Sequence, residues 1–369
     1  MRTHLVTFLI SLGVTSLLTP LVLRAANRLK LYDQPDGERK IHVGQIPRLG
    51  GIAIAIGFVT PLIALLFWKN DLGFALQRDP TRTAAFFGGF AAIVGVGLVD
   101  DLRGLGAWPK LGVQVAVGVG LWASGLSFNR ITLLDVPIDL GLWSLPFTVI
   151  WVAAIVNAMN LIDGLDGLAA GVGFFAAFSL FTIALLDGNS TLALFAAAIG
   201  GSVIGFLLYN FSPALIFMGD TGSMAIGYVF AACALWSVSK RSTTLSLVLP
   251  IVALGVPILD TSFAFIRRAA SRRSPFSSDR GHIHHRLLDF GLTQRQAVLS
   301  IYLVCVMLTA VAILIRATDD LRWAAAVVTL GVAMAAVAQA MRRRMAMLAA
   351  KDKVEATPTT VERTDQPPG

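Results

Sequence analysis

Long apolar stretches recur along almost the whole chain, separated by short polar segments or by segments with glycine and proline. A helix that crosses a bilayer needs about 20 mostly apolar residues. The stretches of suitable length are residues 4–24, 49–68, 83–100, 110–126, 143–159, 168–186, 191–209, 222–238, 244–266, 295–316 and 322–340. The pattern therefore predicts an all-α, polytopic membrane protein with about eleven transmembrane helices.

The composition also favours a membrane protein. Of the 369 residues, 56% are hydrophobic and 14% are charged, whereas soluble domains carry about 25% charged residues. The first apolar stretch, from Leu5 to Leu23, is long for a signal-peptide core and lacks a small-x-small cleavage site, so we expect it to be retained. Residues 1–345 are predicted to form one membrane domain, and the polar tail 346–369 is predicted to be disordered.

The distribution of basic residues predicts the orientation in the membrane. An odd number of spans places the two termini on opposite sides. Of the 30 Lys and Arg residues, 21 fall in the C-terminal tail and the loops on its side. Positive charge gathers on cytoplasmic loops, so the N-terminus is predicted outside and the C-terminus in the cytoplasm. The net charge of +8 then fits these loops and anionic lipids or phosphorylated substrates, and no nucleic acid partner is expected.

The same topology sorts the polar residues that could carry chemistry. All of them fall on the predicted cytoplasmic side, although the span count did not use them. They are Lys40, His42, Asp100, Asp101, Asn160, Asp163, Asp166, Asn210, Asp220, His282, His284 and His285. This agreement predicts a single active site that faces the cytoplasm.

Two adjacent acids, Asp100 and Asp101, end the glycine-rich span 83–100. Ionisable residues at a membrane boundary are costly and usually have a partner. Mg²⁺ is a natural partner, because it binds through one or two carboxylates together with substrate phosphates. The alternative is a hydrated helix end with Arg103 as the counter-charge.

The segment from Asn157 to Leu168 is denser in polar groups, with Asn157, Asn160, Asp163 and Asp166 at intervals of three. If the segment is helical, this spacing places all four on neighbouring positions of one face. Glycines at 164 and 167 would then break the helix and let a ligand approach the backbone. The alternative is that the two acids cap the next helix. Capping leaves the asparagines unexplained, so a functional role is favoured.

The segment Phe217-Met-Gly219-Asp220-Thr-Gly-Ser223 opens the span 222–238. Its small residues predict a tight turn at the positive end of a helix, which is a natural anion site. Asp220 is there expected to be either the N-cap or a metal ligand.

Three of the five histidines of the chain lie in the segment Arg280-Gly-His282-Ile-His284-His285-Arg286. Zinc is one possible ligand, but it usually needs a fourth firm ligand, often cysteine. The only cysteines, Cys233 and Cys305, lie in apolar stretches. His and Arg together also suit diphosphate oxygens, and substrate contact is favoured.

Two further features complete the survey. The charged segment Asp33–His42, followed by Pro47-Arg-Leu-Gly-Gly51, is either a positive loop or a substrate contact. Asp260 lies inside the predicted span 244–266, and the sequence identifies no partner for it.

The chain resembles the polyprenyl-phosphate N-acetylhexosamine-1-phosphate transferase family in five segments that occur in order. These are DQPDGERKIH…PRLGG, VDDLRGLG, NAMNLIDGLDGLAAG, FMGDTGS and RGHIHHRLL. The resemblance covers about residues 30 to 290, and the bacterial branch that initiates O-antigen, common-antigen and teichoic-acid synthesis is the most similar. It implies a bacterial inner-membrane enzyme that transfers N-acetylhexosamine 1-phosphate, with GlcNAc as the expected sugar. The implied donor is a UDP-sugar, the acceptor is undecaprenyl phosphate, and UMP is released.

The resemblance also implies roles for individual residues. Asp100 and Asp101 would lie beside the metal and the lipid phosphate, and Asp220 would be the leading Mg²⁺ ligand, with Mn²⁺ as a substitute. Asp163 would join Asp100 and Asp101 as a catalytic acid. The residues that would bind substrate are Asn160, Asp166, Asn210, Phe217, Gly219, His282, His284, His285, Lys40 and His42. A homodimer is compatible with the sequence.

Phosphoryl transfer needs mainly alignment and charge stabilisation, which these groups can supply. Direct attack by the lipid phosphate, with Asp100 or Asp101 keeping it deprotonated, is favoured over a covalent aspartyl intermediate, but the sequence does not separate the two.

Three alternatives to this function remain at this point. The sister phospho-N-acetylmuramoyl-pentapeptide transferases typically carry three consecutive histidines followed by an acid, whereas here Ile283 interrupts the histidines and Arg286 follows them. A transporter of anionic sugar-nucleotides or lipids would place polar groups near the midplane, and no half-to-half repeat is seen. A membrane zinc hydrolase is disfavoured because HExxH is absent.

Overall fold

The computed structural model describes residues 1–31, 46–67, 71–133, 136–240, 244–271 and 282–320, with isolated positions at 322, 323, 325 and 329. The chain divides into two compact units, Met1–Asp320 and Leu321–Gly369. The predicted span 322–340, apart from those isolated positions, and the predicted tail 346–369 lie outside the described residues.

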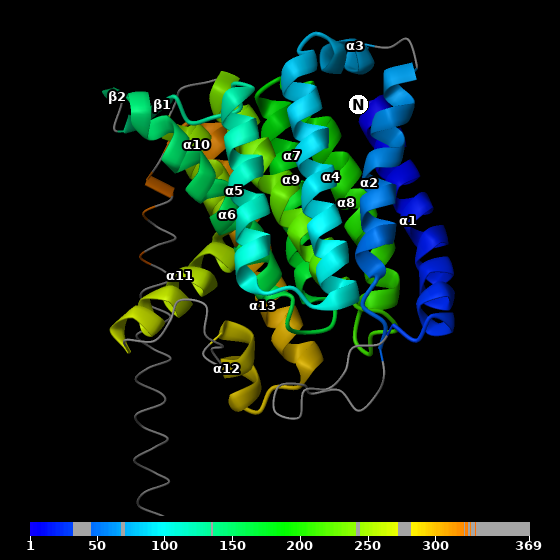
Figure 1. The fold of residues 1–369 in the computed structure, drawn as a ribbon. Helices are drawn as coiled ribbons and strands as arrows, with labels where there is room; N and C mark the ends of the chain where they lie inside the picture. The colour runs from blue at the N-terminus through cyan, green and yellow to red at the C-terminus, as the bar shows by residue number, and fades with distance from the viewer. Residues whose placement is uncertain are drawn as a thin grey trace, which may run out of the picture. The chain divides into compact units, whose positions relative to one another are not determined.

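The first unit is built almost entirely of helices (Figure 1). A short antiparallel hairpin pairs β1 (Arg130–Leu133) with β2 (Val136–Asp139), and the 3₁₀ turn η1 (Gly141–Trp143) follows it. The helices are α1 (Arg2–Arg28), α2 (Gly50–Phe67), α3 (Asp71–Gln77), α4 (Pro80–Arg103), α5 (Ala107–Ala123), α6 (Ser144–Ile162), α7 (Leu168–Leu186), α8 (Ser190–Asn210), α9 (Gly219–Lys240), α10 (Thr244–Ala253), α11 (Gly255–Ala270), α12 (Ile283–Asp289) and α13 (Gln294–Thr318).

The predicted spans coincide with helices wherever the structure describes them, with one exception. The predicted span 244–266 is two helices, α10 and α11, separated at Leu254, and Pro257 just after the break has no N–H to donate to the carbonyl of residue 253. Among the described residues, eight helices are long and apolar enough to cross a membrane. A nearly all-α fold with several helices able to cross a membrane is therefore confirmed, and the β1–β2 hairpin departs from the all-α prediction. The count of eleven spans and the orientation of the termini stay predictions.

Helix α9 forms the centre of the bundle. Its apolar segment is 94% buried, compared with 22% for α1. A helix that is hydrophobic on all sides belongs in the interior, and α9 contacts α2, α4, α6 and α8. Because α9 begins at Gly219, Asp220 lies at the end of the most deeply buried helix.

Successive long helices alternate in direction, so many of the predicted site residues meet at one end of the bundle. The helices α4, α6 and α8 end there, and α2, α5, α7, α9 and α13 begin there, at the lower end in Figure 1. Backbone hydrogen bonds join two of these segments: Gly50 and Gly51 donate to the carbonyls of Phe217 and Met218, each at 2.9 Å. A Cβ on Gly51 would lie 2.1 Å from the nitrogen of Gly222, so only glycine permits this approach.

Candidate active site

Three carboxylates converge at this end of the bundle. Asp100 and Asp101 lie in the last turn of α4, and Asp220 lies in the first turn of α9. One oxygen of each can be chosen so that all three atoms lie within 4.8 Å of one another. We call these three residues the acidic cluster. The sequence predicted that they would meet, and the structure brings them together.

Asp101 caps the start of α9. Its Oδ1 accepts the backbone N–H of Asp220 at 2.8 Å, and its Oδ2 accepts the backbone N–H and the hydroxyl of Thr221 at 2.9 and 2.5 Å. The helix end predicted to be an anion site thus receives an anionic side chain of the protein itself, the Asp101 carboxylate. Asp220 itself is not the N-cap, because it lies inside α9, which begins at Gly219. Gly219 has φ +66°, and a Cβ there would lie 2.5 Å from Asp101 Oδ1, so this position favours glycine.

Lys110, near the start of α5, links two members of the acidic cluster. Its Nζ lies 2.7 Å from Asp220 Oδ2 and 3.2 Å from Asp100 Oδ1. Asp100 Oδ1 also accepts the backbone N–H of Leu105 at 2.8 Å. Lys110, and not the Arg103 of the alternative interpretation, is thus the cationic side chain that pairs with Asp100. Sequence analysis missed Lys110, although a lone lysine at the start of an apolar helix just after two acids was a usable signal.

Asn160, near the end of α6, holds the other side of Asp220. Its amide donates to Asp220 Oδ1 at 2.9 Å and to Ser223 Oγ at 3.0 Å. The hydroxyl of Ser223, which sequence analysis did not single out, donates to the carbonyl of Gly219 at 2.9 Å. Both oxygens of Asp220 are therefore oriented by side chains from other helices.

Asp163 is the C-cap residue of α6 and lies next to the acidic cluster. Burial, together with the negative charges of Asp220 and Asp101, raises the pKa of Asp163 to about 8. The positive charge of Arg48 partly opposes this shift. The protein therefore crowds negative charge at this point, as expected of a site that receives a cation.

The spacing of the four polar residues in the 157–166 segment predicted that they share one helical face, and this prediction is wrong. Helix α6 ends at Ile162, and Gly167 has φ +78°, so the helical spacing stops before Asp166. Asp166 instead accepts the backbone N–H of Ala214 at 3.0 Å. Asn157 donates to Gln114 Oε1 at 2.6 Å. The capping alternative is also wrong, since α7 has Gly167 as its N-cap and no side-chain cap.

Asn210 joins the end of α8 to the start of α7. Its side chain accepts the backbone N–H of Gly167 at 3.0 Å and donates to the carbonyl of Ile216 at 2.9 Å. The backbone of Phe217 donates to the carbonyl of Pro47 at 2.8 Å. These contacts hold the loops around the acidic cluster. The roles of Asn210 and Phe217 in substrate binding stay predictions.

The predicted histidine segment forms the short helix α12 at the same end. His282, His284 and His285, which we call the histidine cluster, have stacked or tilted rings, with centroids 5.7 and 4.4 Å apart. His284 packs against the loop after α6, since a Cβ on Gly164 would lie 2.6 Å from its Nε2. Within the described part of the chain, the only group suited to a metal is acidic and includes no histidine. Lys40 and His42 lie outside the described residues.

Charge balance indicates what the acidic cluster can bind. Three carboxylates face one lysine ammonium, so the cluster carries excess negative charge in a partly buried place. Carboxylate oxygens are the donors that Mg²⁺ and Mn²⁺ prefer. The residues present therefore fit a divalent cation that also contacts an anionic ligand.

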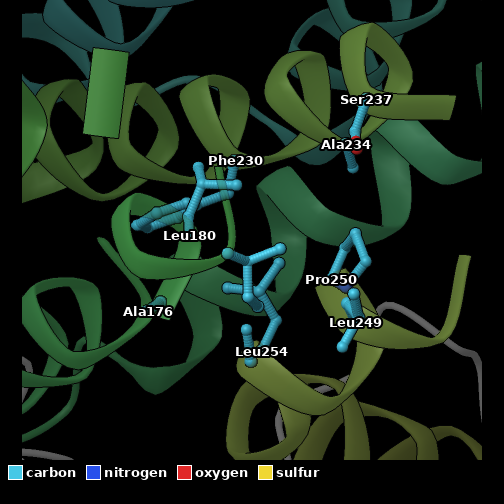
Figure 2. Close-up of a pocket in the computed structure, with 10 residues that line it drawn as sticks. Ala176, Leu180, Phe230, Ala234, Ser237, Leu249, Pro250 and Leu254 are labelled. Atoms are coloured by element: carbon cyan, nitrogen blue, oxygen red, sulfur yellow. The ribbon is translucent and has the colours of Figure 1, made fainter. Parts of the chain in front are cut away.

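An apolar pocket between α7, α9 and α10 lies away from this chemistry (Figure 2). Phe230, which lines it, is ten residues after Asp220 on α9, or about 15 Å farther along the helix. Its lining contains no ionisable side chain. The candidate active site is therefore the acidic cluster and its surroundings, and not this pocket.

Comparison with known proteins finds a matching family and similar chains. The model of glycosyl transferase family 4 matches residues 83–238. A Bacillus subtilis protein described as a probable undecaprenyl-phosphate N-acetylglucosaminyl 1-phosphate transferase is 39% identical over 313 residues, which are 84% of each chain. The decaprenyl-phosphate N-acetylglucosaminephosphotransferase of Mycobacterium leprae is 37% identical over 79% of this chain and 78% of its own. The undecaprenyl-phosphate alpha-N-acetylglucosaminyl 1-phosphate transferase of Escherichia coli is 28% identical over the same shares.

Proposed function

The chain belongs to the family of polyprenyl-phosphate N-acetylhexosamine-1-phosphate transferases, within glycosyl transferase family 4, and on that premise we propose its substrates and site. The donor is UDP-GlcNAc, the acceptor is undecaprenyl phosphate, and the products are undecaprenyl-diphosphate-GlcNAc and UMP. The reaction takes place at the cytoplasmic face of the bacterial inner membrane and begins a cell-envelope polysaccharide.

The observation that carries this proposal is the excess of carboxylates around Lys110 at one end of a membrane helix bundle. Asp100, Asp101 and Asp220 lie at helix ends, where a lipid phosphate and a water-soluble nucleotide can both reach them. Phosphoryl transfer between two anions needs positive charge and alignment more than covalent chemistry. A site with oriented carboxylates and one lysine suits that requirement.

Asp220, Asp100 and Asp101 would hold Mg²⁺, or Mn²⁺ in its place. When bound, the ion supplies positive charge that offsets the repulsion between the lipid phosphate and the diphosphate. Asn160 and Lys110 keep Asp220 in place through its two oxygens. Lys110 also provides a second cation within reach of the reacting phosphates.

The nucleophile is the phosphate oxygen of the lipid. It attacks the β-phosphorus of the UDP-sugar, the bond to the UMP oxygen breaks, and UMP leaves. Asp100, in the last turn of α4, would keep the attacking phosphate deprotonated. Direct attack needs no covalent intermediate, and we favour it for that reason.

The donor occupies the side of the site formed by the α6–α7 loop, the segment before α9 and α12. Asp163 lies on this side and interacts electrostatically with Asp220 and Asp101 of the acidic cluster. The residues proposed to contact the donor are Asn160, Asp166, Asn210, Phe217, Gly219, His282, His284, His285, Lys40 and His42. Asp166 and Asn210 would act mainly by holding the loops, since their side chains already bind backbone groups.

One assay tests this function directly. Purified protein in detergent or liposomes is incubated with labelled UDP-GlcNAc, undecaprenyl phosphate and Mg²⁺, and lipid-linked label and UMP are measured. We expect both products in equal amounts, and EDTA should abolish them. Lipid product with UDP-GalNAc but not with UDP-GlcNAc would change the sugar assignment. Uptake of intact sugar-nucleotide without any lipid product would instead support the transporter.

A further inference from the structure

Asp260, whose partner the sequence did not reveal, binds the histidine cluster. It lies on α11, is 6% exposed and has both carboxylate oxygens engaged. Its Oδ2 lies 2.8 Å from His282 Nδ1, and its Oδ1 accepts the backbone N–H of Ile283 at 2.8 Å. His282 is equally buried, at 6% exposure. The two residues are 22 positions apart in the chain, so this contact belongs to the tertiary structure.

The contact fixes the orientation of the His282 ring. An ionised carboxylate can only accept hydrogen bonds, so the proton of the pair lies on His282 Nδ1. Nε2 then points away from Asp260, and within the described residues it has no hydrogen-bond partner. A carboxylate on one ring nitrogen is the usual means of selecting which nitrogen faces a ligand.

The rest of the histidine cluster is arranged toward the active-site loop. The ring of His284 stacks parallel to that of His282, with an angle of 5° between the planes. His284 is 2% exposed and contacts the loop at Gly164, one residue after Asp163. Its Nδ1 is buried without a hydrogen-bond partner in the described part of the chain. Burial lowers the pKa of His284 to about 4, so this ring is neutral near pH 7.

We propose that Asp260 is a positioning residue for the donor: it holds α12 in place and directs His282 Nε2 toward the diphosphate-sugar part of the nucleotide. This role rests on the proposed function, because it assumes that the donor lies against α12. Asp260 does not contact the acidic cluster, so it acts through His282 and not through the metal site. The KM for the lipid acceptor should therefore not depend on Asp260.

The variant Asp260→Asn separates this role from a purely structural one. Asparagine keeps an oxygen that can accept the N–H of Ile283, so α12 stays anchored, but it replaces the ionic acceptor of His282 with an amide. The same exchange in a carboxylate–imidazole pair is known to leave the geometry intact and to favour the wrong tautomer. Asp289→Asn, at the exposed end of the same helix, is the matched control.

Steady-state kinetics should show a split between the two substrates. In Asp260→Asn, kcat/KM for UDP-GlcNAc should fall about 10- to 100-fold, while KM for undecaprenyl phosphate stays within about twofold. Asp289→Asn should match the wild type. In a His282→Gln background, adding Asp260→Asn should lower kcat/KM for UDP-GlcNAc by less than about threefold more, because both changes remove the same Asp260–His282 interaction. Equal behaviour of the Asp260 and Asp289 variants, or fully additive losses, would overturn the proposal.

A second measurement does not depend on turnover. Nitrogen-15 spectra of histidine-labelled protein, with His282 assigned by its loss in His282→Gln, report which ring nitrogen is protonated. Wild type should show the proton on Nδ1, and Asp260→Asn should change that signal but not the signals of other histidines outside the cluster. Unchanged spectra would refute the positioning role even in an active enzyme. If wild type makes no lipid product, the proposed function fails, and the spectra still decide the role of Asp260.

Discussion

The acidic cluster and the Asp260–His282 pair bury carboxylates at the same end of the bundle in opposite ways. Asp260 has an N–H donor for each carboxylate oxygen. The groups that influence its pKa are the neighbouring histidines and the backbone of Ile283, and no second acid is among them. In the acidic cluster, Asp100 and Asp220 share Lys110, Asp101 accepts from the start of α9, and one oxygen of each acid lies within 4.8 Å of the other two. The first arrangement is complete without a ligand, whereas the second carries unbalanced charge. The difference teaches that the donors around an acid, more than its burial, decide whether its charge still needs a partner, and for this reason we propose the cation site at the acidic cluster.

The largest effect should come from Asp220→Asn. This change removes a carboxylate that accepts from both Asn160 and Lys110 and is central to the cluster. Turnover should fall by about 10³-fold, in line with the loss of a preorganised electrostatic group. Labelled lipid product measures turnover, and Mn²⁺ titration followed by electron paramagnetic resonance measures metal binding. A variant with normal Mn²⁺ affinity would remove Asp220 from the metal site.

Lys110→Gln should have the next largest effect and should move two quantities in opposite directions. Without the ammonium, the carboxylates of Asp100 and Asp220 attract a cation more strongly, so Mn²⁺ affinity of the substrate-free protein should rise at least about tenfold. Turnover should nevertheless fall about 10- to 100-fold, because the reacting phosphates lose a cation. Lys110→Arg serves as the control that keeps the charge. Weaker Mn²⁺ binding in Lys110→Gln would show that the lysine does not compete with the metal.

A smaller effect should appear in the pH dependence of metal binding. The pKa of Asp163 is about 8 because of burial and the charges of Asp220 and Asp101, so this acid is protonated below that pH. A cation in the acidic cluster favours the ionised form and expels the proton. Mn²⁺ affinity should therefore rise with pH, by at most about tenfold per unit, and level off above the pKa.

Asp163→Asn tests that interpretation. This variant should remove most of the rise between pH 6 and pH 8, with the Asp260→Asn protein as a comparison that keeps the slope. A slope that persists unchanged in Asp163→Asn would assign the proton to another group of the cluster.

The smallest effect on activity is expected for an acid that forms a solvent-exposed ion pair with an arginine. Asp139 pairs with Arg130 across the β-hairpin, with 2.7 Å between Oδ1 and Nε, and both side chains are exposed. Exposed pairs contribute little, so Asp139→Asn should leave lipid-product formation within about twofold of wild type. A large loss of activity would mean that the far end of the bundle influences the site.

Much of the fold followed from hydrophobic patterning. The apolar stretches predicted the positions of helices such as α8 and α9 because a bilayer requires long, continuous apolar helices. Patterning did not predict that 244–266 is interrupted. The break falls at Leu254, shortly before Pro257, whereas Pro20, Pro61 and Pro250 lie inside helices, so neither hydrophobicity nor the presence of a proline marks it.

The sequence by itself determined which residues form the acidic cluster and that they belong to one side of the bundle. Asp100, Asp101 and Asp220 could be identified because acids at the ends of apolar spans are costly to keep without a purpose. Alternation of helix direction then placed them together, since α4 runs toward this end of the bundle and α9 begins there.

Only the tertiary structure decided how each acid is used. Asp101 caps α9, Asp166 holds a loop and Asp260 binds His282. In the sequence all three are simply aspartates in or beside apolar segments. The partner of a carboxylate comes from another helix, often more than a hundred residues away, and sequence spacing describes neighbours only within one helix. The pairing of Lys110 with Asp220 is of this kind, because α5 packs against α4 and α6, and these two helices contact α9.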